Sequence, residues 1–288
     1  MTVDGTALVT GASAGIGRAL AAEFAANGHD VVLVARRETE LNALANDLED
    51  EHGIRAYAID QDLASVDAPN ELKAATDERG VQVDVLVNNV GIGTQGAFVE
   101  NDLGRELDQL QLNVVTPTQL THIYGREMAD RGRGGVLNVA STAAWFPGPF
   151  MAVYYASKAY MKTFSEGVAE ELREEGVDVT VLCPGPVDTE FQGRADNEDT
   201  PLGSGEMQDV GMVARAGYDG LQGGDTVVVT GWKYRFLTKL SNVLPNRFTR
   251  KSAKDLSRGP APGTAPRTGV RTRRRGRTPR RRRPATGR

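Results

Sequence analysis

Short apolar runs alternate with longer amphipathic segments through residues 1–231. Short apolar runs bounded by turn residues indicate buried strands, and the segments between them indicate helices. The predicted strands occupy residues 6–10, 30–36, 54–60, 83–89, 135–140, 177–183 and 225–231. Because helices separate the strands, we predict an α/β protein with one doubly wound, seven-stranded parallel sheet and helices on both faces.

A glycine-rich turn joins the first predicted strand to the first predicted helix. Residues 10–17 read TGASAGIG. Glycines let the backbone turn tightly and approach a pyrophosphate, and the helix start supplies free N–H groups and a positive dipole end. Strand, turn and helix in this order predict a dinucleotide site. Its contacts are predicted to come from Gly11, Ser13, Gly15, Ile16 and Gly17.

Two arginines follow the second strand, where the adenosine ribose normally binds. NAD-binding folds tend to have a carboxylate there, whereas this chain has Ala35, Arg36 and Arg37. A guanidinium group pairs bidentately with a 2′-phosphate, so these residues predict NADP(H) in preference to NAD(H). The alternative is that both arginines lie at the solvated start of the next helix.

Polar turns follow the third and fourth strands as well. Asp62 and Leu63 come after the third strand, where the carboxylate either accepts the adenine amino group or caps a helix starting near Asp67. After the fourth strand, NNVG supplies Asn89 and Gly91. Open α/β sheets bind ligands at the carboxyl ends of their strands, so these turns are predicted to contact the cofactor.

Tyr154 and Lys158 lie four residues apart in a helix predicted near 153–175, and therefore on one face of it. A free phenol has a pKa of about 10, and a nearby ammonium group favours phenolate and lowers that pKa. Ser141 ends the fifth strand and presents its hydroxyl there. These side chains predict a proton-transfer site. The alternative is that Tyr154 is a core aromatic residue and Lys158 extends to solvent.

Asn113 is a polar residue inside the run LQLNVV, within a long helix predicted for residues 103–131. A buried Asn must find hydrogen bonds. It is therefore either a structural pin or a functional residue.

Large apolar side chains beside the proton-transfer site predict an apolar substrate. The loop there contains Trp145, Phe146, Pro147, Phe150 and Met151, with Ile92 and Phe191 expected opposite. A glycine-rich cluster at 203–205 suggests a mobile lid.

Taken together, these motifs resemble the short-chain dehydrogenase/reductase family. The family's order and spacing are matched over residues 5–231 by TGASAGIG, NNVG, Asn113, Ser141, Tyr154-x-x-x-Lys158 and PGPVDT. VLVARR and VASTAA resemble an NADP-preferring subgroup. Two positions depart from the pattern: Val90 replaces the usual Ala beside the cofactor, and Ala140 replaces a Ser.

The resemblance implies a Rossmann-type fold and a role for each residue. Tyr154 would be the general acid in reduction and the general base in oxidation, and Ser141 would hold the substrate oxygen. Lys158 would lower the phenol's pKa and bind the nicotinamide ribose, placing both Tyr154 and Lys158 against the cofactor. Asn113 would anchor a water chain that resupplies protons. The turn after the sixth strand would contact the nicotinamide end through Pro184, Val187 and Thr189.

The composition and the first residues of the chain indicate the cellular compartment. Cys183 is the only cysteine, which excludes a disulfide within the chain and fits a reducing environment. The start MTVDGTALVTG lacks a basic-then-apolar signal, and no apolar run approaches about 18 residues. We therefore expect a soluble, cytoplasmic protein.

Charge divides the chain into different parts. Residues 1–250 carry 20 basic and 37 acidic side chains, whereas residues 251–288 carry 14 and 1. The acidic part is typical of either a halophilic protein or an ordinary acidic cytosolic enzyme. We expect a catalytic domain at 1–231, an amphipathic helical extension at 232–256 and a disordered Arg/Pro-rich tail at 257–288.

The extension places Trp232, Phe236, Leu240 and Val243 at spacings of three and four. By default this apolar stripe packs on the protein's own core, and the alternatives are a neighbouring subunit or a membrane surface. The tail is either a nucleic-acid-binding segment, an idle segment or the product of a shifted reading frame. Nucleic-acid binding is disfavoured because no aromatic residue accompanies the arginines and the rest of the chain is acidic.

The expected function is NADP(H)-dependent interconversion of a carbonyl and an alcohol on a small or medium apolar substrate, by a homodimer or homotetramer. No metal site is predicted. The rival classes are an NADP(H)-binding regulator without turnover and a nucleic-acid-binding protein. A regulator needs the phosphate turn but no proton relay, so the Asn, Ser, Tyr and Lys set favours the enzyme.

Overall fold

The seven predicted strands form one sheet in the computed structural model, which describes residues 3–191 and 207–241. The strand order is β3-β2-β1-β4-β5-β6-β7, and all neighbouring strands are parallel. The strands are β1 Thr6–Thr10, β2 Asp30–Ala35, β3 Ala56–Asp60, β4 Val85–Asn88, β5 Gly134–Val139, β6 Val177–Cys183 and β7 Val227–Val229. The predicted Rossmann-type fold is thereby confirmed.

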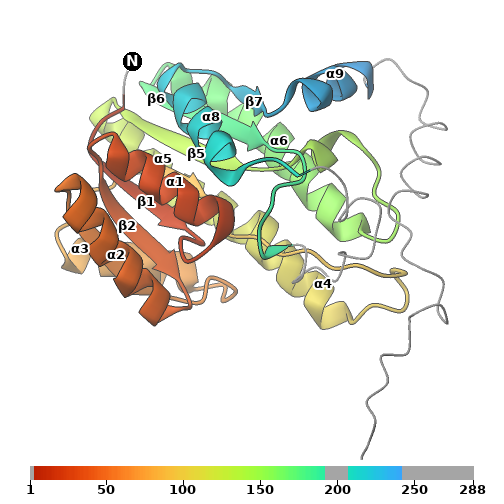
Figure 1. The fold of residues 1–288 in the computed structure, drawn as a ribbon, viewed down its shortest axis with the longest axis horizontal. Coiled ribbons are helices and arrows are strands. Elements are labelled where there is room, and N and C mark those ends of the chain that lie inside the picture. The colour runs from red at the N-terminus through yellow and green to blue at the C-terminus, as the bar shows by residue number, and fades with distance from the viewer. Residues whose placement is uncertain (1–2, 192–206, 242–288) are drawn as a thin grey trace, which may run out of the picture.

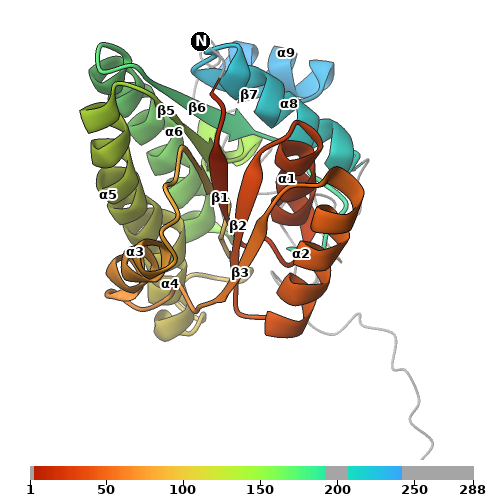
Figure 2. The same cartoon turned by 90° about the vertical axis from the view of Figure 1, so that its left-hand side faces the viewer.

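Helices cover both faces of the sheet, as Figures 1 and 2 show. One layer consists of α1 Gly15–Ala26, α2 Glu38–His52 and α8 Val210–Gln222, which share a buried apolar cluster with the sheet. The other face is covered by α3 Ala68–Glu78, α5 Thr116–Arg131 and α6 Ala152–Arg173. Two further helices are α4 Leu103–Leu110 and α9 Trp232–Ser241.

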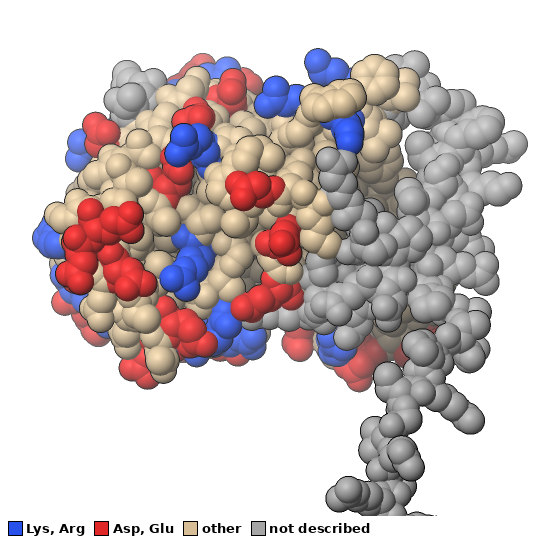
Figure 3. Space-filling model, viewed as in Figure 1, with Lys and Arg blue, Asp and Glu red and all other residues tan. Residues whose placement is uncertain are grey.

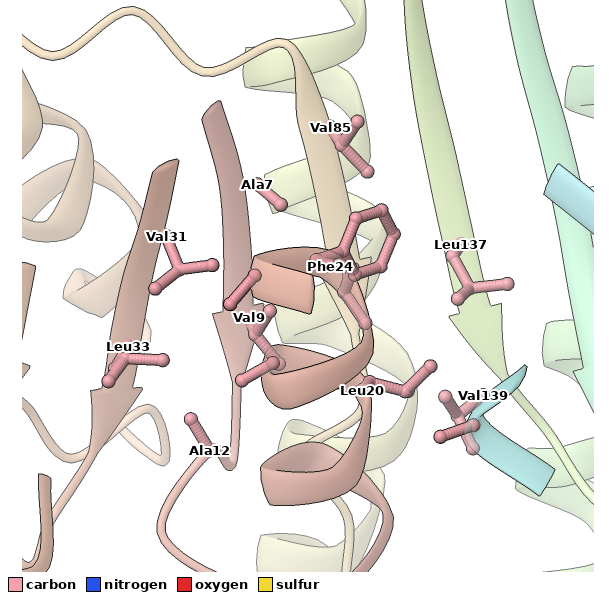
Figure 4. Close-up of a cluster of buried hydrophobic side chains, with 14 of the residues drawn as sticks. Ala7, Val9, Ala12, Leu20, Phe24, Val31, Leu33, Val85, Leu137 and Val139 are labelled. Carbon is pink, nitrogen blue, oxygen red and sulfur yellow. The ribbon is translucent and has the colours of Figure 1, made fainter. Parts of the chain in front are cut away.

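Side chains alternate between the two faces of each strand, which explains why an apolar core lies on each face of the sheet. In β1, Ala7 and Val9 pack with Phe24 of α1, while Leu8 packs with Tyr124 of α5 on the opposite face. Successive strand residues point to opposite faces, so a strand buried on both faces needs an unbroken apolar run. Figure 4 shows the first of these cores, with Phe24 among side chains from several strands.

The long helix predicted for residues 103–131 is interrupted. Gln111–Val115 form a π-helical turn between α4 and α5, and the N–H of Thr116 bonds to the oxygen of Gln111, five residues back. Pro117 has no N–H to donate to the oxygen of Asn113, so the α-helical hydrogen-bond ladder breaks here. The prediction of one continuous α-helix was therefore wrong at this turn.

The strand order reverses beside β1, which pairs with β2 on one side and with β4 on the other. Connections leave such a point in opposite directions and open a crevice at the strand carboxyl ends. The predicted site residues follow these strand ends. The predicted lid at 203–205 lies outside the described residues.

Candidate active site

A cavity of about 540 Å³ lies at the carboxyl ends of the strands. Nearly all of the residues predicted from sequence line it. They are Gly11, Ser13, Gly15, Ile16, Arg36, Arg37, Asp62, Leu63, Asn89, Gly91, Ser141, Tyr154, Lys158, Pro184, Val187 and Thr189. Gly17 and Asn113 do not line the cavity, but both contact residues that do. The fold therefore brings the predicted cofactor residues and the proton-transfer residues to one place.

The glycine-rich turn has the geometry that a pyrophosphate requires. Gly11 and Gly15 have φ values of +68° and +54°, which glycine adopts without strain. A Cβ on Gly17 would lie 2.3 Å from the main-chain oxygen of Gly11, so only glycine fits there. The N-cap of α1, Ala14, makes no side-chain cap hydrogen bond. The N-terminal N–H groups of α1 thus suit an anionic group, and the turn fits a dinucleotide cofactor.

Thr10 fixes this turn to the neighbouring strand end, and sequence analysis did not single it out. Its buried hydroxyl donates to the oxygen of Val87 (3.1 Å) and accepts the N–H groups of Asn89 (2.9 Å) and Val90 (3.1 Å). The Asn89 amide in turn donates to the Thr10 oxygen at 2.9 Å. The two strand ends that flank the crevice are therefore held together by one residue pair.

The two arginines after β2 have different surroundings. Arg37 donates to the hydroxyl and main-chain oxygen of Ser13, each at 3.2 Å, and so braces the glycine-rich turn. Arg36 is 67% exposed and lies 3.9 Å from the Asp62 carboxylate. Arg36 is thus the arginine with freedom to pair with a phosphate at this strand end.

Asp62 does not cap α3, so the helix-cap alternative is wrong. The N-cap position of α3 is Asp67, and the Asp62 carboxylate instead accepts the N–H of Ala64 at 3.1 Å. Asp62 therefore holds the turn that carries the adjacent Leu63 into the cavity.

Tyr154, Ser141 and Lys158 converge from α6 and the end of β5. Ser141 is the N-cap of a short 3₁₀ helix, Thr142–Trp145, and its oxygen accepts the N–H of Ala143 at 3.1 Å. The Ser141 hydroxyl donates to the Pro184 oxygen at 3.5 Å and lies near enough to Tyr154 to lower the pKa of its phenol. The Lys158 ammonium group lies 5.8 Å from the centre of the Tyr154 ring and donates to the Val139 oxygen at 2.9 Å. Lys158 is buried, so its extension into solvent is excluded.

Burial controls the protonation of this pair. It raises the pKa of Tyr154 to about 12, against the lowering effect of the Ser141 hydroxyl. Burial also lowers the pKa of Lys158 from its ordinary 10.5 to about 8. Burial is thus the largest effect on the pKa of the phenol, and the predicted lowering of that pKa by Lys158 stays a prediction. At neutral pH, Tyr154 holds its proton.

Asn113 is a structural pin at the cavity. Its side chain accepts the N–H of Ile92 and donates to the oxygen of Ile92, both at 2.9 Å. It also donates to the Ser157 hydroxyl at 3.0 Å, and Ser157 donates to the Tyr154 oxygen at 2.7 Å. Asn113 therefore ties the loop after β4 to the first turns of α6. The predicted water-anchoring role stays a prediction.

The apolar part of the cavity differs in detail from the prediction. Ile92, Phe146, Met151 and Phe191 line it, and so do three side chains that the sequence analysis did not assign, Tyr155, Tyr234 and Leu237. Trp145 instead packs in a separate apolar cluster, with the Lys162 ammonium group 5.1 Å from its ring centre. The sequence did not indicate that α9 lines the cavity, because Tyr234 and Leu237 lie far along the chain from Tyr154.

Phe150 and Pro147 do not line the cavity either. Phe150 is the only non-glycine residue with positive φ, +67°, among residues 3–191 and 207–241. Its oxygen accepts the N–H of Gly96 at 2.8 Å. Backbone strain of this kind is tolerated where surrounding contacts fix it, and here it shapes the loop that carries Met151 into the cavity.

No three side chains of His, Cys, Asp or Glu gather into a potential metal site in the part of the chain that the structure describes. None of its helices combines the length and apolar character needed to cross a bilayer.

Comparison with known proteins identifies the class. The short chain dehydrogenase family matches residues 5–200. The 7beta-hydroxysteroid dehydrogenase of Clostridium sardiniense is 36% identical over 178 residues, covering 62% of this chain and 67% of the relative. The very-long-chain 3-oxoacyl-CoA reductase of Mus musculus is 29% identical over 262 residues, covering 86% and 83%. With several other curated relatives, the match spans 54 to 64% of the relative's length.

Solved structures agree with this. A short-chain dehydrogenase from Sphingobium yanoikuyae in complex with NADPH has a TM-score of 0.75 and 29% identity, covering 83% of this chain and 94% of that chain. A structure from Burkholderia phymatum in complex with NAD, with 23% identity and a TM-score of 0.74 over the same shares, has the same fold.

Fold, glycine-rich turn and Tyr–Lys pair define a nicotinamide-dependent oxidoreductase of carbonyl and alcohol groups. The chain belongs to the short-chain dehydrogenase/reductase family.

Proposed function

We propose that this protein reduces apolar ketones of medium size with NADPH and oxidises the corresponding alcohols with NADP⁺. The observation that carries the proposal is the convergence of Tyr154, Ser141 and Lys158 with the glycine-rich turn on one cavity. The names of the relatives, which act on a steroid and on very-long acyl chains, support an apolar substrate.

The cofactor supplies or accepts the hydride when it is bound. Tyr154, protonated at neutral pH, donates its proton to the carbonyl oxygen during reduction. Ser141 holds the same oxygen by a hydrogen bond, and the buried Lys158 ammonium group stabilises the phenolate that remains. In oxidation Tyr154 must first lose its proton before it can accept the proton of the alcohol.

The preference for NADP(H) rests on Arg36. The neighbouring structures do not decide it, since one holds NADPH and another NAD. Arg36 stands at the end of β2 with its guanidinium group exposed toward the cavity rim. A guanidinium group at this strand end favours a 2′-phosphate over a ribose hydroxyl.

Apolar side chains on α4 and in the π-helical turn after it support the proposed homodimer or homotetramer. Leu103, Leu107 and Leu110 are exposed on α4, and Val115 is exposed just beyond it. An apolar face of this kind is typical of a helix that packs against another subunit. Light scattering coupled to size exclusion should give twice or four times the monomer mass of 30.9 kDa.

The enzyme is tested with Tyr154→Phe and with Tyr160→Phe as its matched control, since both residues lie on α6. The first variant should bind NADPH normally and lose at least about 100-fold in turnover, because general acid catalysis contributes about that much. The control should keep its turnover. The assay is a panel of ketones and secondary alcohols with both cofactors. Absence of turnover in the unmodified protein, with NADPH binding intact, would favour a regulator.

A further inference from the structure

The exposed side of α9 carries an apolar stripe that the protein's own core does not cover. Trp232 is 77% exposed and Phe236 66% exposed, and Leu240 continues the stripe one turn further along. The opposite side of α9 faces the protein, with Thr238 buried and Tyr234 lining the cavity. The default expectation that this stripe packs on the core was therefore wrong for the described residues, and Val243 lies outside them.

Basic residues accompany this stripe, whereas the part of the chain before it is acidic. Residues 1–231 carry 15 basic and 37 acidic side chains, whereas residues 232–250 carry five basic ones and no acidic one. Lys233, Arg235 and Lys239 belong to α9 itself. Figure 3 shows this contrast on one face of the molecule, where red side chains are spread over the α1 and α2 side and the surface over α9 is tan and blue.

We propose that α9 lies flat on an anionic lipid surface. Trp232, Phe236 and Leu240 enter the boundary between headgroups and acyl chains, and the basic side chains of α9 meet lipid phosphates. A short helix with aromatic and aliphatic residues on one face and flanking Lys and Arg fits this boundary. Each basic side chain near an anionic membrane adds attraction, and the same surface would repel the acidic residues 1–231, which sets the orientation of that part of the protein.

The same observations argue against two other occupants. A second copy of the chain needs about 800 Å² on each side for a stable interface, more than a stripe of three side chains supplies. A nucleic acid would attract the basic residues but would give the stripe of Trp232, Phe236 and Leu240 no apolar surroundings. Lipid is the partner that satisfies both the charge and the apolar side chains.

The position of α9 connects this surface to the cavity. Tyr234 and Leu237 line the cavity from the same helix that carries the exposed stripe. An apolar substrate dissolved in the bilayer would therefore meet the cavity at its lipid-facing side. This route rests on the proposed function, whereas lipid binding itself does not.

The test uses the full-length protein with vesicles of phosphatidylcholine, alone or mixed with phosphatidylglycerol. Binding is measured by co-sedimentation for the unmodified protein, for Trp232→Ser/Phe236→Ser and for Phe98→Ser/Val99→Ser, which removes two equally exposed apolar residues from a loop outside α9. We expect binding to the mixed vesicles, at least about tenfold weaker for the α9 variant and unchanged for the loop variant. Equal binding by the α9 variant, or no binding by the unmodified protein, would overturn the proposal.

A second readout does not depend on removing residues from α9. Trp145→Phe leaves Trp232 as the single tryptophan, since the chain has two. Its emission should shift to shorter wavelength with the mixed vesicles and stay unchanged with duplex DNA. An unchanged emission with vesicles, or an oligomeric state altered by Trp232→Ser/Phe236→Ser without vesicles, would assign α9 to another partner. Turnover on water-soluble ketones should be the same for the α9 variant and the unmodified protein, which separates this test from that of the proposed function.

Discussion

The ammonium group of Lys158 and the main-chain oxygen of Val139 form a hydrogen bond of 2.9 Å in the interior. Burial lowers the pKa of Lys158 from 10.5 to about 8, so the unfolded chain holds this proton more tightly than the folded one. The charge therefore opposes folding below pH 8, and its cost disappears as the pH rises from 8 to 10.5. At 1.36 kcal/mol per pKa unit, that cost is about 3 kcal/mol at neutral pH.

Lys158→Met should consequently stabilise the protein while removing its activity. The free energy of unfolding at pH 7 should rise by about 1–3 kcal/mol, because a buried charge is replaced by an apolar chain and one hydrogen bond is lost. The gain should shrink toward pH 10, and turnover should fall at least about 100-fold. Urea unfolding at pH 7 and pH 10 measures the first effect. A variant equally destabilised at both pH values would mean that the ammonium group is well solvated or fully compensated.

Arg36→Ala should weaken NADPH far more than NADH. Only NADPH offers a 2′-phosphate, and a charge-assisted hydrogen bond contributes about 1.5–3 kcal/mol, or roughly 10- to 150-fold in affinity. Fluorescence titration with each cofactor measures the difference. Arg18→Ala is the matched control, since Arg18 is also an exposed arginine paired with a carboxylate, that of Asp47 at 3.8 Å. The same loss for both cofactors would assign Arg36 to the support of the fold.

Gly17→Ala should disrupt the glycine-rich turn. Its Cβ would lie 2.3 Å from the Gly11 oxygen and 2.4 Å from the Asn89 amide nitrogen, so the turn must move. We expect a loss of about 1–3 kcal/mol in stability and at least tenfold in NADPH affinity. Gly167→Ala, where an added Cβ meets open space on α6, should instead stabilise the protein by about 1 kcal/mol. Thermal unfolding measures the stability of both variants, and fluorescence titration measures their affinity for NADPH. A normal NADPH affinity in Gly17→Ala would contradict the packing argument.

A chain ending at Leu256 should keep its fold and its turnover. Residues 257–288 consist mostly of Arg, Pro, Gly, Thr and Ala, and such a segment buries too little apolar surface to offset its ordering entropy. The full-length and shortened chains should therefore have the same melting temperature and the same kcat on any ketone that is turned over. Loss of activity on shortening would mean that the tail belongs to the site or to an interface.

The sheet and the cofactor side of the site could be predicted because they depend on local patterns. The apolar runs fix the strands, and glycines at the end of β1 fix the turn, since both effects act between near neighbours in sequence. Parallel strands then bring their carboxyl ends together without further information.

The protonation of the site, the role of Thr10 and the orientation of α9 could not be predicted, because they depend on contacts between residues that are distant in sequence. The raised pKa of Tyr154 follows from an apolar cluster with Tyr155, Met151 and Phe191, residues that join only in the fold. Thr10 has no sequence signal beyond ending a strand. The outward direction of Trp232 could not be predicted, because an amphipathic pattern shows that a helix has two faces but not which one meets the protein.

The π-helical turn at Gln111–Val115 also has an evolutionary consequence. A π turn holds one residue more than an α-helical turn, so it behaves as a single-residue insertion between α4 and α5. Removing one residue there would restore a regular helix and rotate α4 by about 100° relative to α5. A chain without this residue could keep either the hydrogen bonds of Asn113 or the present direction of the exposed α4 face, but not both. Relatives with a gap at this position are expected to differ both in the loop after β4 and in how their subunits assemble.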